Sequence, residues 1–185
     1  DCFRVLHGLS EGRPGLSIDV YGRLALVQTF REPLGEGELE RIEAFLRARV
    51  RRDALVAWNP RADWPRDPFE RWHAPEPAAL EEHVATEFGV RYAIRARHRG
   101  QDPWLFLDLR AGRRVLAALA PGRTVLNLYA YTGSAGVCAA ARGASEVWTV
   151  AFARSSLEVA RRHAELNDVR PGVIRDVHED VIPVL

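Results

Sequence analysis

The chain has 185 residues, enough for one large or two small domains, and its 47% hydrophobic content can fill a packed core. A net charge of +1 provides no general attraction to nucleic acid, so any RNA contact must come from local patches. The absence of an apolar run of about 18 residues argues against a membrane span, and two cysteines without metal-like spacing indicate a reducing, cytoplasmic location.

The first part of the chain predicts a small α+β domain. Residues 4–30 have the pattern of an antiparallel β unit, with turn signals at 12–15 and at Tyr21-Gly22. After this unit, apolar residues at helical spacing predict an amphipathic helix with an inward face formed by Leu39, Ile42, Phe45, Leu46 and Val50.

A stretch rich in proline and tryptophan separates this helix from the later strands. Residues 58–77 contain five prolines together with Trp58, Trp64 and Trp72, and they are predicted to form a packed loop. The indole rings could stack RNA bases, or they could cover a domain surface.

A second, α/β domain is predicted for the rest of the chain. We place the boundary near Gly100, so the two domains span 1–100 and 101–185. Residues 101–119 should form a strand-like entry followed by a helix. From 124 to 167 the pattern reads strand, glycine turn, helix, strand and helix, which is half of a nucleotide-binding sheet.

The elements of this half-sheet carry end signals. An apolar run around Val125 indicates a buried first strand that ends at the turn 131–133. Gly143 is a candidate left-handed C-cap for the first helix. Ser155 and Glu158 form a candidate capping box at the start of the second helix.

The glycine turn favours one class of cofactor. Backbone NH groups and a helix N-terminus meet at such a turn, and a side chain at Gly133 is expected to block a ligand there. On the G-x-G-x-x-G template, the chain keeps the second and third glycines, Gly133 and Gly136, but has Tyr131 in place of the first. Because the first glycine serves the pyrophosphate turn, its absence argues against a dinucleotide and allows a cofactor such as S-adenosylmethionine.

The same region carries a family resemblance. The run VLNLYAYTGSAG at 125–136, preceded by LFLDLRAGRRVL at 105–116, resembles the class I S-adenosylmethionine-dependent methyltransferases of large-subunit ribosomal RNA, the cytosine-5 group and its close relatives. The segment HGLSEGRPGLSIDVYGRLALVQTF at 7–30 is similar to the central domain of that family, and residues 84–96 resemble the last strands of the same domain. The resemblance implies an α/β, Rossmann-like class I methyltransferase domain preceded by a small α+β domain.

The resemblance also implies a function and a site. We expect an S-adenosylmethionine-dependent enzyme that methylates RNA, with ribosomal RNA as the substrate. The residues expected to bind the cofactor are Asp108, Arg110, Asn127, Tyr129, Tyr131, Thr132, Gly133, Gly136, Phe152 and Asp180. For Asp108 and Arg110, an equal alternative is a buried ion pair that links the domains.

Two departures from the family limit this inference. At the end of the second strand, 146–152, the family has an acid that binds the ribose hydroxyls, whereas this chain has Ala151. A third strand is expected near 173–175, with Asp180 after it, but the chain stops at Leu185 before a fourth strand. We therefore expect the domain to be incomplete at its C-terminus and the catalytic residues to lie beyond it.

These departures keep other functions open. A degenerate methyltransferase fold could serve as an RNA-binding or scaffold protein, which Ala151 favours. A nicotinamide-dependent oxidoreductase is disfavoured by Tyr131 and by the missing ribose acid. The open edge of the third strand could be covered by further strands or by a second copy, so a homodimer is considered.

Other candidate sites have ordinary alternatives. Arginine clusters at 47–52, 91–99 and 110–114 could contact RNA or form solvated faces. Cys138 lies among alanines and is expected to be a small buried residue rather than a nucleophile. No metal site is expected, because the histidines form no spaced set.

Overall fold

The computed structural model describes residues 1–61, 72–96 and 103–184. The domain boundary expected near Gly100 lies outside these described residues. Within them, no helix combines the length and the apolar character that crossing a membrane requires.

Unit 1 comprises Asp1–Thr86 and Ile94–Pro103, and it is built on a sheet with the strand order β1-β2-β3-β4. Its strands and the helix that crosses over between the last two are β1 (Cys2–Leu6), β2 (Leu16–Tyr21), β3 (Leu24–Thr29), α1 (Glu38–Arg49) and β4 (Leu55–Pro60). The first three strands are antiparallel, and β3 and β4 are parallel. The expected antiparallel unit is therefore confirmed.

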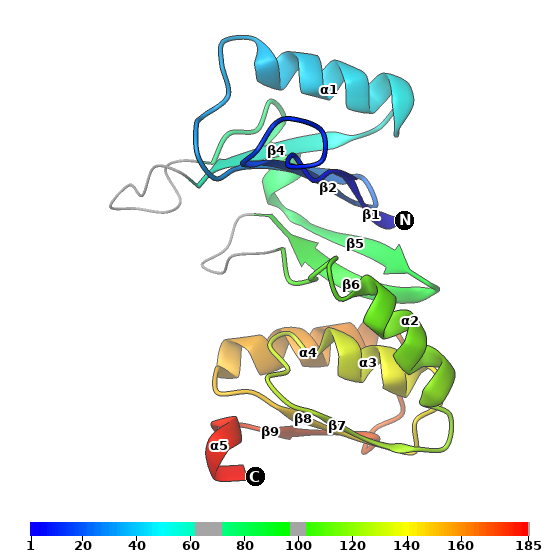
Figure 1. Cartoon of the computed structure of the whole chain (residues 1–185). Coiled ribbons are helices and arrows are strands. Elements are labelled where there is room, and N and C mark those ends of the chain that lie inside the picture. Colours follow the sequence, from blue (N-terminus) through cyan, green and yellow to red (C-terminus); the bar gives the residue numbers. More distant parts are fainter. Residues whose placement is uncertain (62–71, 97–102, 185) are drawn as a thin grey trace. The chain divides into compact units, whose positions relative to one another are not determined.

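Helix α1 covers one face of this sheet (Figure 1). Leu46 is fully buried and packs with Ile18, Val27 and Val56 in the hydrophobic core. Phe45, which the helical pattern placed on the same face, is 52% exposed. Neighbouring residues on a helix point about 100° apart, so burying Leu46 turns Phe45 toward solvent.

The remaining part of the first half is a short helical turn and a hairpin. These elements are η1 (Pro77–Leu80), β5 (Glu82–Glu87) and β6 (Val90–Arg95). Phe88 and Gly89 join the two strands with φ angles of 50° and 75°, as a tight two-residue hairpin turn requires. Trp58 lies within β4 rather than in a loop, while Trp64 falls outside the described residues.

Unit 2 comprises Glu87–Ala93 and Trp104–Leu185, and its sheet has the order β7-β8-β9 with all neighbours parallel. Its elements in chain order are α2 (Arg110–Leu119), β7 (Thr124–Asn127), α3 (Ser134–Ala141), β8 (Glu146–Val150), α4 (Arg154–Leu166), β9 (Ile174–Val177) and α5 (Val181–Val184). Helices α2, α3 and α4 lie on one side of the sheet (Figure 1). This arrangement confirms the expected Rossmann-like α/β fold. The expected strand-like entry is absent from residues 103–109, which contain turns and bends.

One expected helix end is confirmed and one is wrong. Gly143 has a φ of 93° and follows α3, where its amide donates to the carbonyl of Ala140, so it acts as the left-handed C-cap. The capping box does not form. Helix α4 has Ala153 as its N-cap without a side-chain hydrogen bond, so Ser155 already lies inside the first turn and cannot cap it.

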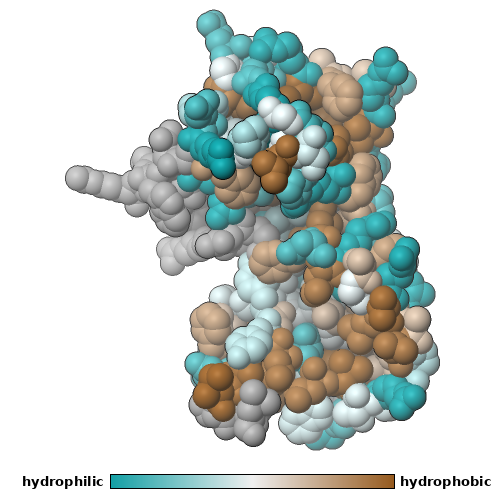
Figure 2. All heavy atoms as spheres, viewed as in Figure 1, coloured by the Kyte–Doolittle hydropathy of each residue, from teal (hydrophilic) through white to brown (hydrophobic). Residues whose placement is uncertain are grey.

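The first strand of unit 2 is less buried than its apolar sequence predicted. Val125 packs toward the helices, but Leu126 is 56% exposed on the opposite sheet face. Leu126 pairs in register with Trp148, which is 37% exposed. Figure 2 also shows hydrophobic surface where α2 lies in Figure 1, and Val115 of this helix is 58% exposed.

The sheet face that carries Leu126 and Trp148 is exposed and apolar. We expect this face to make the 185-residue chain self-associate, because contiguous exposed apolar surface marks interaction sites. Replacing Leu126 and Trp148 together by threonine should shift the protein toward the monomer in sedimentation velocity. Leu9→Thr is the control, since Leu9 is 70% exposed outside this face. A parent protein that is monomeric and melts cooperatively would contradict the expectation.

Candidate functional site

Three segments follow the carboxyl ends of the parallel strands of unit 2, namely 129–133, 151–152 and 178–180. The amide of Ala130 donates to the carbonyl of Val150 at 2.9 Å, which joins the first segment to the end of β8. The carboxyl ends of parallel strands form the usual ligand crevice of such sheets.

Backbone contacts also join the second and third segments. The amide of Ala151 donates to the carbonyl of Val177 at 3.1 Å. The Nε2 atom of His178 lies 2.9 Å from the carbonyl oxygen of Phe152. The structure therefore brings together the ends of the strands to which most of the expected site residues belong.

The turn after β7 has an unusual backbone. Tyr129 and Tyr131 have φ angles of 51° and 49°, and Gly133, the N-cap of α3, has 68°. A left-handed conformation costs a residue other than glycine roughly 1–3 kcal/mol and persists only where the surroundings impose it. Tyr131, which replaces the first glycine of the G-x-G-x-x-G template, thus adopts a left-handed backbone conformation that favours glycine.

The two glycines of the turn serve close packing. A Cβ atom on Gly133 would lie 2.6 Å from the Cβ of Ala160 in α4. A Cβ on Gly136 would lie 3.0 Å from Nδ2 of Asn127 and 3.1 Å from Oγ1 of Thr149. A larger residue at Gly133 would therefore disturb the packing of the turn on α4. A loss of cofactor binding in a Gly133 variant could then result from this disturbance as well as from a blocked ligand contact.

Thr132 is turned inward rather than toward a ligand. It is 2% exposed, and its hydroxyl donates to the carbonyl of Trp104 at 2.6 Å. The ring of Phe106 lies 5.5 Å from that of Tyr131. The segment before α2 thus packs directly against the turn.

Asp108 and Arg110 do not pair with each other among the described contacts. Asp108 is exposed and accepts a hydrogen bond from the amide of Leu109. Arg110 lies over the ring of Phe88 at 4.5 Å, and its Nε is 3.8 Å from Oε1 of Glu87. The side chain of Arg110 is therefore directed to the hairpin turn.

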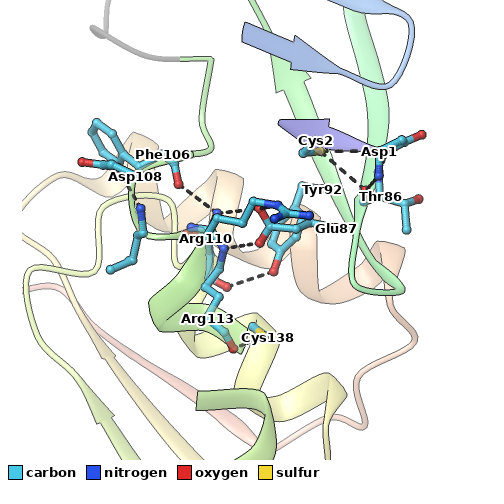
Figure 3. A network of polar contacts seen from close by, with 12 residues as sticks. Asp1, Cys2, Thr86, Glu87, Tyr92, Phe106, Asp108, Arg110, Arg113 and Cys138 are labelled. Atoms are coloured by element: carbon cyan, nitrogen blue, oxygen red, sulfur yellow. Dashed lines mark hydrogen bonds and ion pairs between the residues drawn. The ribbon is translucent and has the colours of Figure 1, made fainter. Parts of the chain in front are cut away.

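The buried ion pair of this region is formed by Arg113 and Glu87 instead (Figure 3). Arg113 is 0% exposed, donates to Glu87 at 2.5 and 2.9 Å, and donates to the carbonyl of Phe106 at 2.8 Å. Burial lowers the pKa of Arg113, but the hydrogen bond and charge of Glu87 raise it overall.

Cys138 is a buried structural residue, as expected. Its thiol donates to the carbonyl of Arg113 at 3.6 Å, and burial raises its pKa, which disfavours the nucleophilic thiolate.

Ala151, which stands where the family has the acid that binds the ribose hydroxyls, is buried. Ala151 is 5% exposed and packs with Ala130 and Leu157. Asp180 is exposed, and its Oδ1 accepts a hydrogen bond from the amide of Ile182 at the start of α5. A second role for Asp180 in binding stays a prediction.

Two aromatic side chains remain open at the strand ends. Tyr129 is 69% exposed and Phe152 is 80% exposed. By contrast, Nδ2 of Asn127 is buried and has no hydrogen-bond partner in the structure. Exposed rings and an unpartnered donor are what a bound heterocycle with acceptor atoms would satisfy.

His163 is a buried residue of this region that belongs to none of the sequence motifs. Its ring nitrogens lie 3.0 Å from the carbonyl oxygens of Thr132 and Ala93. A signal existed, because His163 follows Leu157 and Ala160 at the spacing of one helix face, and both are buried.

The arginine clusters are partly occupied by ion pairs. Arg47 pairs with Glu43 and Glu76, and Arg51 pairs with Asp53 at 2.6 Å. Arg91 pairs with Asp168 at 3.0 Å, while residues 97–99 lie outside the described part of the chain. The exposed arginines left in these clusters include Arg52, Arg95 and Arg114.

A cavity of about 540 Å³ lies in unit 1 between the segments 12–16 and 29–38. Its main charged groups satisfy each other. Glu38 accepts a hydrogen bond from the amide of Gly35 and another from Arg13, both at 2.7 Å, and both lower the pKa of its carboxyl group. Across residues 1–61, 72–96 and 103–184, the histidines, cysteines and acids form no group that could hold a metal ion.

Comparison with known proteins identifies relatives over the whole chain. A family model described as S-adenosylmethionine-dependent methyltransferase matches residues 4–181. A ribosomal RNA large subunit methyltransferase of Deinococcus radiodurans is 31% identical over 185 residues, which cover 98% of this chain and 45% of that protein. The chain thus spans just under half of the length of this relative.

Solved structures agree with the same grouping. The solved structure of an S-adenosylmethionine-dependent methyltransferase from Streptococcus mutans has a TM-score of 0.77 and 25% identity, covering 99% of this chain and 47% of the other. A methyltransferase structure complexed with SAH also has a TM-score of 0.77 and 25% identity, covering 99% and 46%.

Proposed function

Because the chain belongs to the S-adenosylmethionine-dependent methyltransferase family, we propose that unit 2 binds this cofactor at the carboxyl ends of β7, β8 and β9. We further propose that the protein acts on RNA, and on large-subunit ribosomal RNA in particular, because its relatives are ribosomal RNA large subunit methyltransferases. When bound, the cofactor supplies a methyl group attached to a positively charged sulfur. An RNA substrate also favours a cytoplasmic location.

The turn 129–133 carries the cofactor proposal. Its left-handed residues lie between β7 and α3, and Nδ2 of the neighbouring Asn127 has no hydrogen-bond partner in the structure. Tyr129 and Phe152 would flank the adenosine part, since both rings are exposed at neighbouring strand ends. Asp180, two residues beyond His178, would then stand at the adenine end.

The remaining residues expected to bind the cofactor are less accessible to a ligand or are engaged in other contacts, except for Asp108. Thr132 and Gly136 support the crevice through packing, because Thr132 is 2% exposed and Gly136 lies against Asn127. Arg110 is engaged by Phe88 and Glu87, so a cofactor contact would require it to leave them. Asp108 is exposed and remains a candidate.

Calorimetric titration of the 185-residue chain with S-adenosylmethionine and with NADH tests the cofactor assignment. We expect binding of the first and none of the second, because Tyr131 replaces the glycine of the pyrophosphate turn. Preferential binding of NADH would contradict the assignment and support an oxidoreductase. Filter binding with large-subunit ribosomal RNA and with transfer RNA transcripts tests the proposed substrate class.

A scaffold protein on the same fold is the second candidate, and Ala151 is the observation that favours it. The position holds no acid, and its side chain packs with Ala130 and Leu157. RNA binding without any binding of S-adenosylmethionine would identify this alternative.

Phe152→Ala is expected to weaken S-adenosylmethionine binding by roughly tenfold, within the range of alanine substitutions that remove a ring stacked on a base. Stability should be unchanged, because the ring is 80% exposed. Calorimetry and thermal melting measure the two effects. Phe45→Ala is the matched control, with a ring 52% exposed in unit 1, and equal affinity losses in both variants would contradict the role of Phe152.

A further inference from the structure

The cofactor turn depends on support from neighbouring elements. Tyr129 and Tyr131 are both left-handed, and Thr132 between Tyr131 and Gly133 is 2% exposed. The Thr132 hydroxyl is held by the carbonyl of Trp104, and the Thr132 carbonyl faces α4. The contact made by this carbonyl is therefore a candidate for what maintains the turn.

That contact is made by the side chain of His163 in α4. Its Nδ1 lies 3.0 Å from the carbonyl oxygen of Thr132, and its Nε2 lies 3.0 Å from the carbonyl oxygen of Ala93. Both partners are acceptors, so the ring must donate; a neutral imidazole has one N–H group and an imidazolium has two. His163 is 0% exposed, so water does not reach it to replace these bonds.

The segment 91–93, which faces Nε2 of His163, is held in place by further contacts within unit 2. Asn167, the C-cap of α4, accepts a hydrogen bond from the amide of Arg91 at 2.8 Å and donates one to the carbonyl of Arg91 at 2.7 Å. Tyr92 packs edge-to-face on the His163 ring at 5.4 Å, and its hydroxyl donates to the carbonyl of Ser134 at 3.3 Å. Arg91 thus binds Asn167 at the end of α4, and Ala93 faces His163 within α4, so both ends of the segment 91–93 contact this helix.

We propose that His163 is a positioning residue that holds the Thr132 carbonyl and thereby keeps Tyr129 and Tyr131 in the conformation of the cofactor crevice. His163 is a buried residue of α4, so its proposed role is to support the turn from the interior of unit 2. Its effect on ligand affinity rests on the proposed function. Its effect on the turn does not.

Two substitutions separate the two ring nitrogens. The amide nitrogen of asparagine reaches the place of Nδ1, and that of glutamine reaches the place of Nε2. His163→Asn should therefore preserve the bond to Thr132, whereas His163→Gln should preserve only the bond to Ala93. A residue that merely fills space would give no such difference.

Hydrogen exchange of the peptide spanning the turn, measured by mass spectrometry without ligand, is the first readout. We expect exchange about tenfold faster in His163→Gln and within about threefold of the parent in His163→Asn, the loss of one net hydrogen bond being worth roughly one decade. His83→Gln in unit 1 is the control and should leave the turn unchanged. Equal exchange in the two His163 variants would overturn the proposal.

Calorimetry with S-adenosylmethionine is the second readout, with an expected rise in Kd of about tenfold for His163→Gln and less than about threefold for His163→Asn. A parent protein that does not bind the cofactor would contradict the proposed function, while hydrogen exchange would still decide the role of His163. If both variants fail to fold, imidazole nitrogen NMR on the parent decides it. A proton on Nδ1 is expected, and a ring protonated only on Nε2 would overturn the proposal.

Discussion

Glu87→Ala is expected to lower the free energy of unfolding by about 3–5 kcal/mol, the usual cost of removing one partner of a buried ion pair. Arg113 is 0% exposed, so the substitution leaves a guanidinium enclosed without its carboxylate. Nη1 of Arg113 is also buried without a hydrogen-bond partner, so no bond at this atom offsets the loss of the two bonds to Glu87. Since whole domains are stable by roughly 5–15 kcal/mol, urea unfolding should show a large shift of the midpoint.

Glu146→Ala is the matched control for this prediction. Glu146 pairs with Arg175 at 2.8 Å, but these side chains are 30% and 58% exposed, so the loss should be about 0–1 kcal/mol. Replacing Glu87 by leucine and Arg113 by methionine together should recover much of the stability, because no buried charge remains. Similar losses in Glu87→Ala and Glu146→Ala would contradict the structural role of the pair.

Ala151→Asp is expected to tighten S-adenosylmethionine binding by about 10 to 100-fold, because a carboxylate at this strand end could accept hydrogen bonds from the ribose hydroxyls. We expect the gain to lie toward the lower limit of this range. Ala151 is 5% exposed beside Ala130 and Leu157, so the new group is partly desolvated. A polar group in such surroundings should also lower stability by about 1–3 kcal/mol.

Ala151→Asn separates charge from shape, since the amide has nearly the same volume as the carboxylate and no charge. Calorimetry should rank the affinities as aspartate above asparagine above the parent, and the advantage should shrink for a 2′-deoxyribose analogue. Equal affinity in the parent and in Ala151→Asp would show that other residues hold the ribose. In that case Ala151 is no evidence of a degenerate enzyme.

The segment from the turn after β7 to the end of α3 is the part that short sequence patterns predict best. The turn at 131–133, the helix that follows it and the left-handed Gly143 were all expected from residues close together in the chain, and the structure contains them. Hydrophobic spacing likewise predicted the parallel strands and the antiparallel unit. Each of these features depends on the backbone preferences and periodicity of a few neighbouring residues.

Other expectations failed because distant residues decide them. Ser155 and Glu158 satisfy a capping pattern, but α4 begins at Arg154, which leaves Ser155 inside the helix. Leu126 is apolar and was expected to be buried, yet the sheet face that carries it is not covered by α2, α3 or α4. Local preference could not reveal either outcome.

Residues close together in the chain were sufficient to predict the class of fold, the glycine turn before α3 and the tyrosine in place of the first template glycine. Which charges and polar groups meet depends on the packing of distant segments. Glu87 and Arg113 are 26 residues apart, and His163 lies 70 residues from Ala93, whose carbonyl its ring faces. Burial of a charge or of an imidazole depends on what packs around it from every side, and that information is spread over the whole chain.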